Sequence, residues 1–370
     1  MEEWKEYKLE EVCSRLRSGK GIKSDCISNI GLFPVIGGNG MRGYTNKSNF
    51  KGECAVIGRQ GANCGNVRFF MGEAYMTEHA VVAVGNELAD SYFLARLLSL
   101  MHLGNLSAQS AQPGLSIQTL SKQIIRLPSI SYQREISTVL KSLDDKIEVN
   151  KRINDNLEQQ AQVLFNHYFV DTPEILGDCT VGNLTDIASY LNGLAMQKYR
   201  PTANDTGIPV LKIKELGQGK VDEHSDQCSE NIDSQYKVDN GDVIFSWSGT
   251  LMVKIWCGGE CGLNQHLFKV TSEKYPKWFY YFWTLHHLKK FIHIAQDKAV
   301  TMGHIKRSEL EKSEVLIPSN KKLIEIDKII SPLLAKIIAL QTECRNLTAL
   351  RDTLLPKLMS GEVEINKINN

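Results

Sequence analysis

The sequence predicts an α+β protein with two mixed α/β globular domains, separated by two long helices that form an antiparallel coiled coil, and an internal pseudo-two-fold repeat. Three observations support this prediction. The two halves of the sequence resemble each other, which indicates an internal structural repeat. The segment 141–169 contains neither Gly nor Pro, as a long helix requires. The stretches on either side are rich in Gly, Asn and short β-branched runs, which are typical of strands and turns.

Length and composition restrict the classes of protein. A chain of 370 residues, of which 42% are hydrophobic and 23% charged, is ordinary for two or three globular domains. The apolar runs are far shorter than the ~18–20 residues of a membrane span, and the charged N-terminus does not resemble a signal peptide. The nine Cys are scattered, and Cys257 and Cys261 lack zinc-site spacing, so reduced thiols and a cytoplasmic location are expected. The net charge of +1 implies that a partner would supply much of the charge for any DNA binding.

Comparing the chain with itself aligns its two halves. The tripeptide LPS at 127–129 recurs as IPS at 317–319, and the helices that follow superpose without a gap. Upstream, His79 falls on His266, and GECAVIGRQG resembles GDVIFSWSG. The order of segments is therefore a globular domain, a helical segment, a second globular domain, and a second helical segment with a C-terminal tail, at 1–130, 131–170, 171–318 and 319–370.

Both helical segments carry apolar residues at alternating spacings of three and four, which is the coiled-coil pattern. The seam positions are Leu140, Leu143, Ile147, Asn150, Asn154, Leu157, Ala161, Leu164 and Tyr168, and then Ile330, Leu333, Ile337, Leu340, Cys344, Leu347, Arg351, Leu354 and Leu358. Pairing the two copies antiparallel puts a globule at each end of a spacer about 60 Å long. Asn150 and Asn154 would fix the register. Pro332 and Pro356 predict that the second helix is unbroken only between them, after a short helix. The alternative is that both helices are core elements of a larger bundle.

In the first globule, two Gly- and Asn-rich loops at 36–46 and 58–70 carry side chains suited to DNA bases. Glycine lets the backbone approach a ligand closely, and Arg, Asn and Gln bond base edges in the major groove. The candidate DNA-binding residues here are Asn39, Arg42, Tyr44, Arg59, Gln60, Asn63, Asn66 and Arg68. The alternative is that these loops are plain hairpin turns with solvated charges.

The second globule has SWSGTLMVK, residues 246–254, in the place of the first loop's Arg, Gln and Asn set, which indicates a different ligand surface. Its candidates are Lys198, Ser246, Trp247, Ser248 and Lys254. Polar loops before the two helices add Gln109, Gln112, Gln296, Lys298, His304, Lys306 and Arg307, although an ordered linker that caps the helix explains these loops equally well. His79 and His266 favour a structural role over a catalytic one.

Motifs of catalysis are absent from the sequence. It contains no phosphate-binding GxxxxGK[ST], no dinucleotide or adenosylmethionine loop in strand–turn–helix context, and no Asn/Asp-Pro-Pro-aromatic tetrapeptide of amino-methyltransferases. It also lacks HExxH, GxSxG and paired nuclease carboxylates. We therefore predict no catalytic, cofactor-binding or metal-binding residue, and the duplicated plan indicates recognition rather than chemistry.

The segments SLDDKIEVNKRINDNLEQQAQVLFNHYF and LTALRDTLLPKLMSGEVEI resemble the two helical regions of the specificity subunit of type I restriction–modification systems. FPVIGGNGMRGYTNKSNFKGECAVIGRQGANCGNV resembles one class of that family's target-recognition domains. The resemblance covers nearly the whole chain. Its departure is that LPSISYQREI and IPSNKKLIEI lack the second Pro of the Pro-Pro-Leu that often opens the helical regions, which leaves the exact junction open.

The resemblance implies a non-catalytic subunit that binds double-stranded DNA. Each recognition domain would read one half of a bipartite target, and the helices would set the gap. Two modification subunits would dock there, use adenosylmethionine and methylate adenine at N6, and motor–nuclease subunits that use ATP and Mg²⁺ would join for cleavage. The resemblance does not transfer base contacts, because those loops differ between members.

Three other functions stay open on the sequence. One is the specificity subunit of a related two-component restriction enzyme that cuts on both sides of its site. Another is a duplicated scaffold whose loops bind protein, for which binding need not weaken with salt. The third is an enzyme with an unfamiliar site around His79 and His266.

Overall fold

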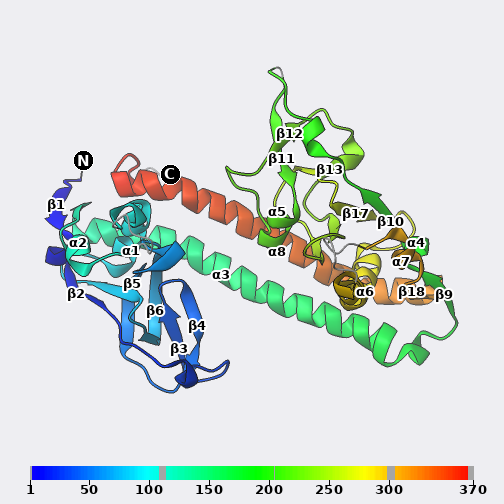
Figure 1. Ribbon diagram of the computed structural model, residues 1–370, viewed down its shortest axis with the longest axis horizontal. Coiled ribbons are helices and arrows are strands. Elements are labelled where there is room, and N and C mark those ends of the chain that lie inside the picture. Colours follow the sequence, from blue (N-terminus) through cyan, green and yellow to red (C-terminus); the bar gives the residue numbers. More distant parts are fainter. Residues whose placement is uncertain (1, 108–113, 204, 298–304, 366–370) are drawn as a thin grey trace. The chain divides into compact units, whose positions relative to one another are not determined.

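The computed structural model describes residues 2–107, 114–203, 205–297 and 305–365 (Figure 1). Its contacts divide the chain into two compact units. Unit 1 comprises Met1–Asp145 and Thr348–Asn370, and unit 2 is the continuous segment Lys146–Leu347. The division falls inside the two long helices, so each helix contributes to both units. The domain limits inferred from the repeat stay predictions.

Unit 1 is built on a six-stranded sheet with the order β2-β7-β5-β6-β3-β4. The pairs are antiparallel except β3 with β6, which is parallel, and Val-rich β7 lies between β2 and β5, as its apolar run predicts. A separate antiparallel pair joins β1 to β8. The strands are β1 Lys5–Lys8, β2 Cys13–Ser18, β3 Phe33–Gly37, β4 Gly40–Thr45, β5 Phe50–Gly58, β6 Val67–Met76, β7 Ala80–Gly85 and β8 Ile124–Leu127.

Helices cover the main core of unit 1. Helix α1 (Ser91–Leu100) begins at Asp90, whose carboxylate accepts the N–H of Phe93 at 2.9 Å, a typical N-cap. Its buried face packs with Ile57 and Val81 of the sheet. The short helix α2 (Ile117–Ser121) is capped by Ser116. Leu355 and Leu358, from the last segment of the chain, belong to the same core as Leu9. The first and the last segments of the chain therefore fold together.

Unit 2 contains two four-stranded sheets in place of one larger sheet. Their orders are β10-β17-β14-β15 and β12-β11-β16-β13, and β18 pairs with β9. The strands are β9 Cys179–Asn183, β10 Ser189–Asn192, β11 Gly207–Leu211, β12 Gln227–Ser229, β13 Lys237–Val238, β14 Val243–Ser246, β15 Met252–Ile255, β16 Cys261–Leu263, β17 Leu267–Thr271 and β18 Glu314–Pro318. The helices that lie wholly in this unit are α4 Leu184–Ile187, α5 Ile213–Gln218, α6 Lys277–Asp297 and α7 Arg307–Glu311.

The two units repeat one plan. The order β2-β7-β5-β6 of unit 1 corresponds to β10-β17-β14-β15 of unit 2, and the pair β1–β8 corresponds to β9–β18. The parallel pair β3–β6 corresponds to β11–β16. Each unit then leads through two helices and one strand into a long helix. The internal repeat predicted from the sequence is therefore present in the topology.

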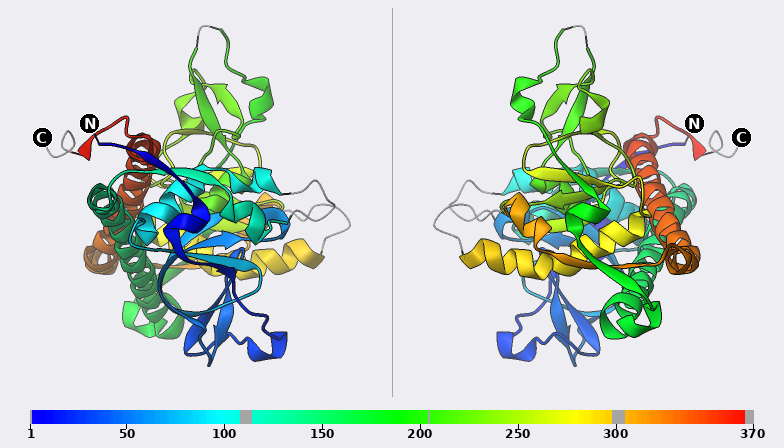
Figure 2. Two further views of the ribbon diagram at one scale, coloured as in Figure 1. Left: turned by 90° about the vertical axis from the view of Figure 1, so that its left-hand side faces the viewer. Right: turned by 90° about the vertical axis from the view of Figure 1, so that its right-hand side faces the viewer.

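The two long helices are α3 (Ile130–Asn166, 37 residues) and α8 (Asn320–Ser360, 41 residues). In unit 1, Asp144 of α3 binds Arg351 of α8, with Nη1 2.9 Å from Oδ1. In unit 2, Asn150 donates to Glu343 at 2.9 Å and Gln341 donates to Glu158 at 3.1 Å. Residue numbers rise along α3 as they fall along α8, so the helices run antiparallel, and Figures 1 and 2 both draw them side by side.

The predicted seam is confirmed, because every seam position of both helices is buried or half-buried. Asn150 and Asn154 are buried in it, at 0% and 6% exposure, and each has an Oδ1 without a hydrogen-bond partner. With these helices and the two mixed α/β units, the predicted α+β fold class is confirmed.

The predicted break at the prolines is wrong. Helix α8 runs without interruption through Pro332 and Pro356. A proline inside a helix removes one backbone hydrogen bond and costs about 3 kcal/mol. Both rings are exposed, so they leave the seam intact. Burying one Leu or Ile side chain contributes roughly 1.5–3 kcal/mol, and the seam buries several of them, including Ile330, Ile337 and Leu340. Packing therefore outweighs the local cost.

Candidate nucleic-acid interface

One tight turn occurs in both units with the same backbone bonds. In unit 1, the turn Thr77–Ala80 between β6 and β7 is closed by the N–H of Ala80 on Thr77 O at 3.0 Å. In unit 2, Leu267 N–H donates to Asn264 O at 3.0 Å. Each first residue is tied to a distant strand: Thr77 N–H donates to Ile36 O at 2.9 Å, and Asn264 N–H donates to Leu211 O at 3.2 Å.

A glycine packs against each turn. The N–H of Gly19 donates to Ala80 O, and that of Gly193 donates to Leu267 O, both at 3.0 Å. A Cβ on Gly19 would lie 2.0 Å from Met76 O, and one on Gly193 would lie 2.3 Å from Asn264 O. No side chain fits at that distance, so these positions require glycine.

A third loop meets each turn through matched bonds. Arg59 N–H donates to His79 O at 2.9 Å, and Arg59 O accepts the N–H of Leu115 at 2.9 Å. In unit 2, Trp247 N–H donates to His266 O at 3.4 Å, and Trp247 O accepts the N–H of Ile305 at 2.9 Å. One more matched pair joins each glycine's neighbour to the strand before the turn: Lys20 N–H donates to Met76 O, and Leu194 N–H donates to Leu263 O, both at 2.9 Å. We call these bonded segments the loop frame of each unit. They comprise residues 19–20, 36, 59, 76–80 and 115 in unit 1, and residues 193–194, 211, 247, 263–267 and 305 in unit 2.

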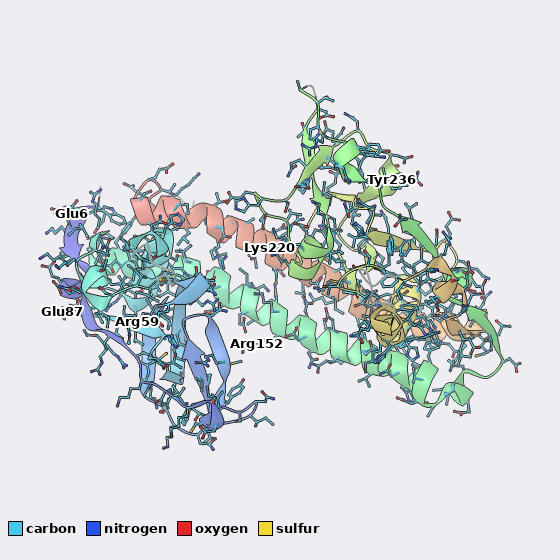
Figure 3. All side chains as sticks on the ribbon, viewed as in Figure 1. Glu6, Arg59, Glu87, Arg152, Lys220 and Tyr236 are labelled. Carbon is cyan, nitrogen blue, oxygen red and sulfur yellow. The ribbon has the colours of Figure 1, made fainter. Side chains whose placement is uncertain are left out.

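The candidate residues of unit 1 gather around its loop frame. Arg68 Nη1 donates to Asn39 O at 2.8 Å, which joins the β3–β4 turn to the start of β6. Asn66 Nδ2 donates to Asn63 Oδ1 at 3.2 Å in the loop that follows Arg59. Arg59 is labelled in Figure 3. The exposed candidates are Asn39, Arg42, Gln60, Asn66 and Arg68, and the half-buried ones are Tyr44, Arg59 and Asn63.

In unit 2, Trp247 stands where unit 1 has Arg59. Its Nε1 donates to Asn192 Oδ1 at 2.9 Å, and its ring lies 5.7 Å from that of Phe268. Ser248 is buried, with Oγ 3.0 Å from Nδ1 of His266. Ser246 is fully buried and donates to Ser248 O at 3.2 Å. Lys254 donates to Gly217 O at 2.8 Å. The two serines are therefore buried residues that support the loop from inside the protein, and the ammonium group of Lys254 is bonded to a backbone carbonyl.

The remaining candidates are spread over unit 2. Lys198 ends a short helical turn, Gln296 lies near the end of α6, Lys306 precedes α7 and Arg307 begins it; all four side chains are exposed. Gln109, Gln112, Lys298 and His304 lie outside the described residues. Which of the candidates touch DNA stays a prediction.

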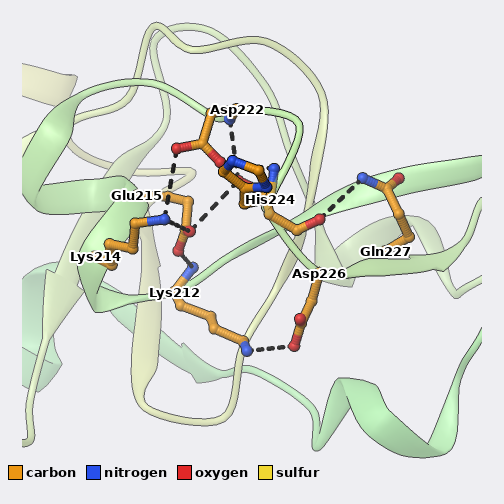
Figure 4. A network of polar contacts seen from close by, with 8 residues as sticks. Lys212, Lys214, Glu215, Asp222, His224, Asp226 and Gln227 are labelled. Carbon is orange, nitrogen blue, oxygen red and sulfur yellow. Dashed lines mark hydrogen bonds and ion pairs between the residues drawn. The ribbon is translucent and has the colours of Figure 1, made fainter. Parts of the chain in front are cut away.

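A second polar network of unit 2 lies around α5 (Figure 4). Lys212 pairs with Asp226, and Lys214 Nζ lies 3.5 Å from Asp222. The backbone N–H of His224 lowers the pKa of the Asp222 carboxyl. Glu215 is buried, and one of its oxygens accepts the N–H of Lys212 at 3.2 Å. These lysines are internally paired, so they are weaker candidates for phosphate contacts than the exposed cations above.

The sequence reasoning missed Glu78 and Gln265, which occupy the second position of the two matched turns. The signal was present, because the alignment that puts His79 on His266 also puts Glu78 on Gln265. Among the described residues, no group of three or more His, Cys, Asp or Glu is placed to hold a metal ion, and no helix is long and apolar enough to cross a bilayer.

Comparison with known proteins identifies the family. The model of the type I restriction modification DNA specificity domain matches residues 1–159 and again residues 177–348. The chain belongs to this family. The two matches agree with the internal repeat, and each includes one of the two loop frames.

Two curated relatives are type I specificity subunits. The chain is 28% identical to the type I restriction enzyme MjaIX specificity subunit of Methanocaldococcus jannaschii over 295 residues, which covers 72% of this chain and 67% of that one. It is 37% identical to the EcoprrI specificity subunit of Escherichia coli over 134 residues, or 35% of this chain and 33% of the relative. The match to the second relative thus spans about a third of its length.

The fold is that of a solved specificity subunit. The crystal structure of the type I restriction–modification S subunit from M. genitalium superposes with a TM-score of 0.64 over 96% of both chains, at 16% sequence identity. At this identity the likeness is one of fold.

Proposed function

We propose that this chain is the DNA-specificity subunit of a type I restriction–modification complex, in which each recognition domain reads one half of a bipartite target. The observation that carries the proposal is the loop frame. Six matched backbone hydrogen bonds hold the same loops in both units, while the side chains they carry differ, as at Arg59 and Trp247. One scaffold with two sets of side chains is suited to recognising two different ligands of one class.

The chemistry of the loops supports DNA as that class. Arg, Asn and Gln bond the base edges of the major groove, and exposed residues of these types line the loops of unit 1. In unit 2, the exposed cations Lys198, Lys306 and Arg307 are suited to phosphates.

The paired helices are suited to setting the gap between the half-sites. Helix α3 has 37 residues, which correspond to about 55 Å at 1.5 Å per residue. Half-sites read on one face of DNA lie about one turn, ~34 Å, apart. A pair of helices of this length can therefore hold two readers at such a spacing.

The α3 helix also offers a surface for partners. Val149, Ile153 and Val163 are 49%, 40% and 65% exposed. Apolar side chains left in solvent along one helix support the docking of partner helices. We propose that two modification subunits dock on the helices and methylate adenine at N6, and that motor–nuclease subunits join them for cleavage. In this assignment adenosylmethionine, ATP and Mg²⁺ bind the partners, and this chain is non-catalytic.

Sequencing of N6-methyladenine tests the proposal. The chain is expressed with its cognate modification subunit in cells that lack other adenine methyltransferases, and the methylated sites are read from single DNA molecules. We expect one split motif, two short halves around a fixed gap. A folded, copurifying pair that leaves DNA unmethylated and binds no duplex would contradict the proposal, and would favour a protein-binding scaffold.

A further inference from the structure

The second residue of each matched turn is held in a defined position. Glu78 follows Thr77, whose N–H is bonded to Ile36 O, and precedes His79, whose carbonyl accepts Arg59 N–H. Gln265 lies in the same way between Asn264, bonded to Leu211 O, and His266, bonded to Trp247 N–H. Because the backbone on both sides is held by hydrogen bonds, the Cα of this residue has a fixed position in both units. We call Glu78 and Gln265 the tip residues of the turns.

Both tip side chains have an oxygen without a partner. Oε2 of Glu78 and Oε1 of Gln265 are shielded from solvent and accept no hydrogen bond. The other end of each side chain meets the next residue. Glu78 Oε1 lies 3.4 Å from His79 Nε2, and Gln265 Nε2 lies 3.4 Å from His266 Nε2. The histidine thus fixes one end of each tip residue, and the free oxygen is at the other end.

An unpaired acceptor shielded from water is unfavourable unless a ligand supplies a donor. A residue that only stabilised the turn would use its oxygen on the backbone. Asn264 does this, since its Oδ1 accepts the N–H of His266 at 3.3 Å. Glu78 and Gln265 do not, although they lie in the same turns. Their oxygens therefore have no donor within the protein, and since both residues are only half-buried, each side chain can turn outward to meet a ligand donor.

The major groove restricts what that donor can be. The hydrogen-bond donors on base edges there are the exocyclic amino groups, N4 of cytosine and N6 of adenine. An ionised Glu only accepts, which suits cytosine N4. A Gln accepts at its oxygen and donates from its nitrogen, which suits N6 and N7 of adenine.

We propose that Glu78 and Gln265 are specificity-determining residues, Glu78 selecting a cytosine in one half-site and Gln265 selecting an adenine in the other. This inference rests on the proposed function and deepens it. It predicts something that the proposed function does not: variants at the two positions must change different halves of the target. Each change must be confined to one base.

Four variants test it: Glu78→Gln, Glu78→Ala, Gln265→Glu and the control Glu87→Gln. Glu87 is exposed, follows the other end of β7, and is labelled with Arg59 in Figure 3, so its variant makes the same charge change away from the turn. Each variant is expressed with the modification partner, and the methylated motif is determined from N6-methyladenine.

Glu78→Gln should replace cytosine by adenine at one position of one half-site, with a change in preference of roughly 5- to 150-fold, as for a good bidentate contact. Glu78→Ala should accept any base at that position. Gln265→Glu should change adenine to cytosine in the other half. The gap, the remaining bases and the motif of Glu87→Gln should stay as in the wild type.

If Glu78→Gln and Gln265→Glu both leave the motif unchanged, the inference is overturned and the proposed function stands. If the wild-type pair itself gives no split motif, the proposed function fails first. A variant that folds but leaves no methylation is tested by binding to duplexes carrying each of the four bases at every position. A base preference identical to the wild type overturns the inference, and a change at a single position supports it.

Discussion

Replacing Asp144 by Asn should destabilise unit 1 by about 3 kcal/mol, because three donors converge on this carboxylate. Tyr92 Oη lies 2.5 Å from Oδ2, Arg96 Nη2 also donates to Oδ2, and Arg351 Nη1 lies 2.9 Å from Oδ1. The side chains of Asp144, Arg96 and Arg351 are only 19%, 23% and 22% exposed. Burial raises the pKa of Tyr92, and its hydrogen bond to Asp144 adds to this, so the hydroxyl stays a donor.

The magnitude follows from what Asn cannot replace. A hydrogen bond to a charged group contributes about 1.5–3 kcal/mol, and breaking a buried ion pair costs about 3–5 kcal/mol. Arg351 also binds Asp352, with Nη2 2.7 Å from Oδ1, so it keeps one counter-charge in the variant. This places the cost at the lower end of the buried range. For a unit of this size, about 3 kcal/mol corresponds to a fall in Tm of roughly 6–12 °C.

Scanning calorimetry of the purified chain measures the change. The matched control is Asp145→Asn, which removes the same charge from the neighbouring exposed residue. We expect the control to keep the wild-type Tm and the Asp144 variant to lose stability in the transition of unit 1. Equal Tm values for the two variants would refute the reasoning, because the network would then contribute nothing beyond the charge itself.

Three further predictions concern other parts of the chain. Gly19→Ala should lower the free energy of unfolding by about 1–3 kcal/mol, since its Cβ would lie 2.0 Å from Met76 O, whereas Gly114→Ala, with nothing within 4 Å of its Cβ, should unfold in urea like the wild type. A similar loss in both variants would contradict this. Inserting one heptad into both α3 and α8 adds about 10 Å, so the methylated motif should keep both halves and gain a longer gap; altered halves around an unchanged gap would show that the helices do not set it. Burial lowers the pKa of His287 to about 4, whereas the pKa of an unfolded His is about 6.5. Between these pH values the unfolded chain binds a proton that the folded chain does not, so the free energy of unfolding should fall as pH drops from 6.5 to 4. The fall should be smaller in His287→Gln, and equal slopes in denaturant titrations would argue against it.

The helical seam could be predicted because its signal is local and periodic. Every seam position between Leu140 and Tyr168 follows from spacing alone, and the structure buries or half-buries each one. The behaviour of Pro332 and Pro356 could not be predicted in this way. Their cost is local, but the packing that outweighs it comes from α3, which lies far away in sequence.

The site shows the same division between local and distant signals. Self-comparison identified which loops correspond, including the exchange of Arg59 for Trp247. It did not show that Ser246 is buried or that Lys254 is tied to Gly217 O. Nor did it single out Glu78, because the bonds that fix its turn come from strands and loops that are distant in the chain, at Gly19, Ile36 and Arg59.

The division of the chain between the units has a consequence for its synthesis. Unit 2 is one continuous segment that ends at Leu347, so all its residues exist before the last part of α8 is translated. Unit 1 needs that last part, because Leu355, Leu358 and Met359 fill the core that contains Leu9. The half of the protein made first is therefore completed last. A ribosome that stops near Leu347 releases a chain whose finished part is its middle, and whose beginning presents the apolar surface that chaperones bind.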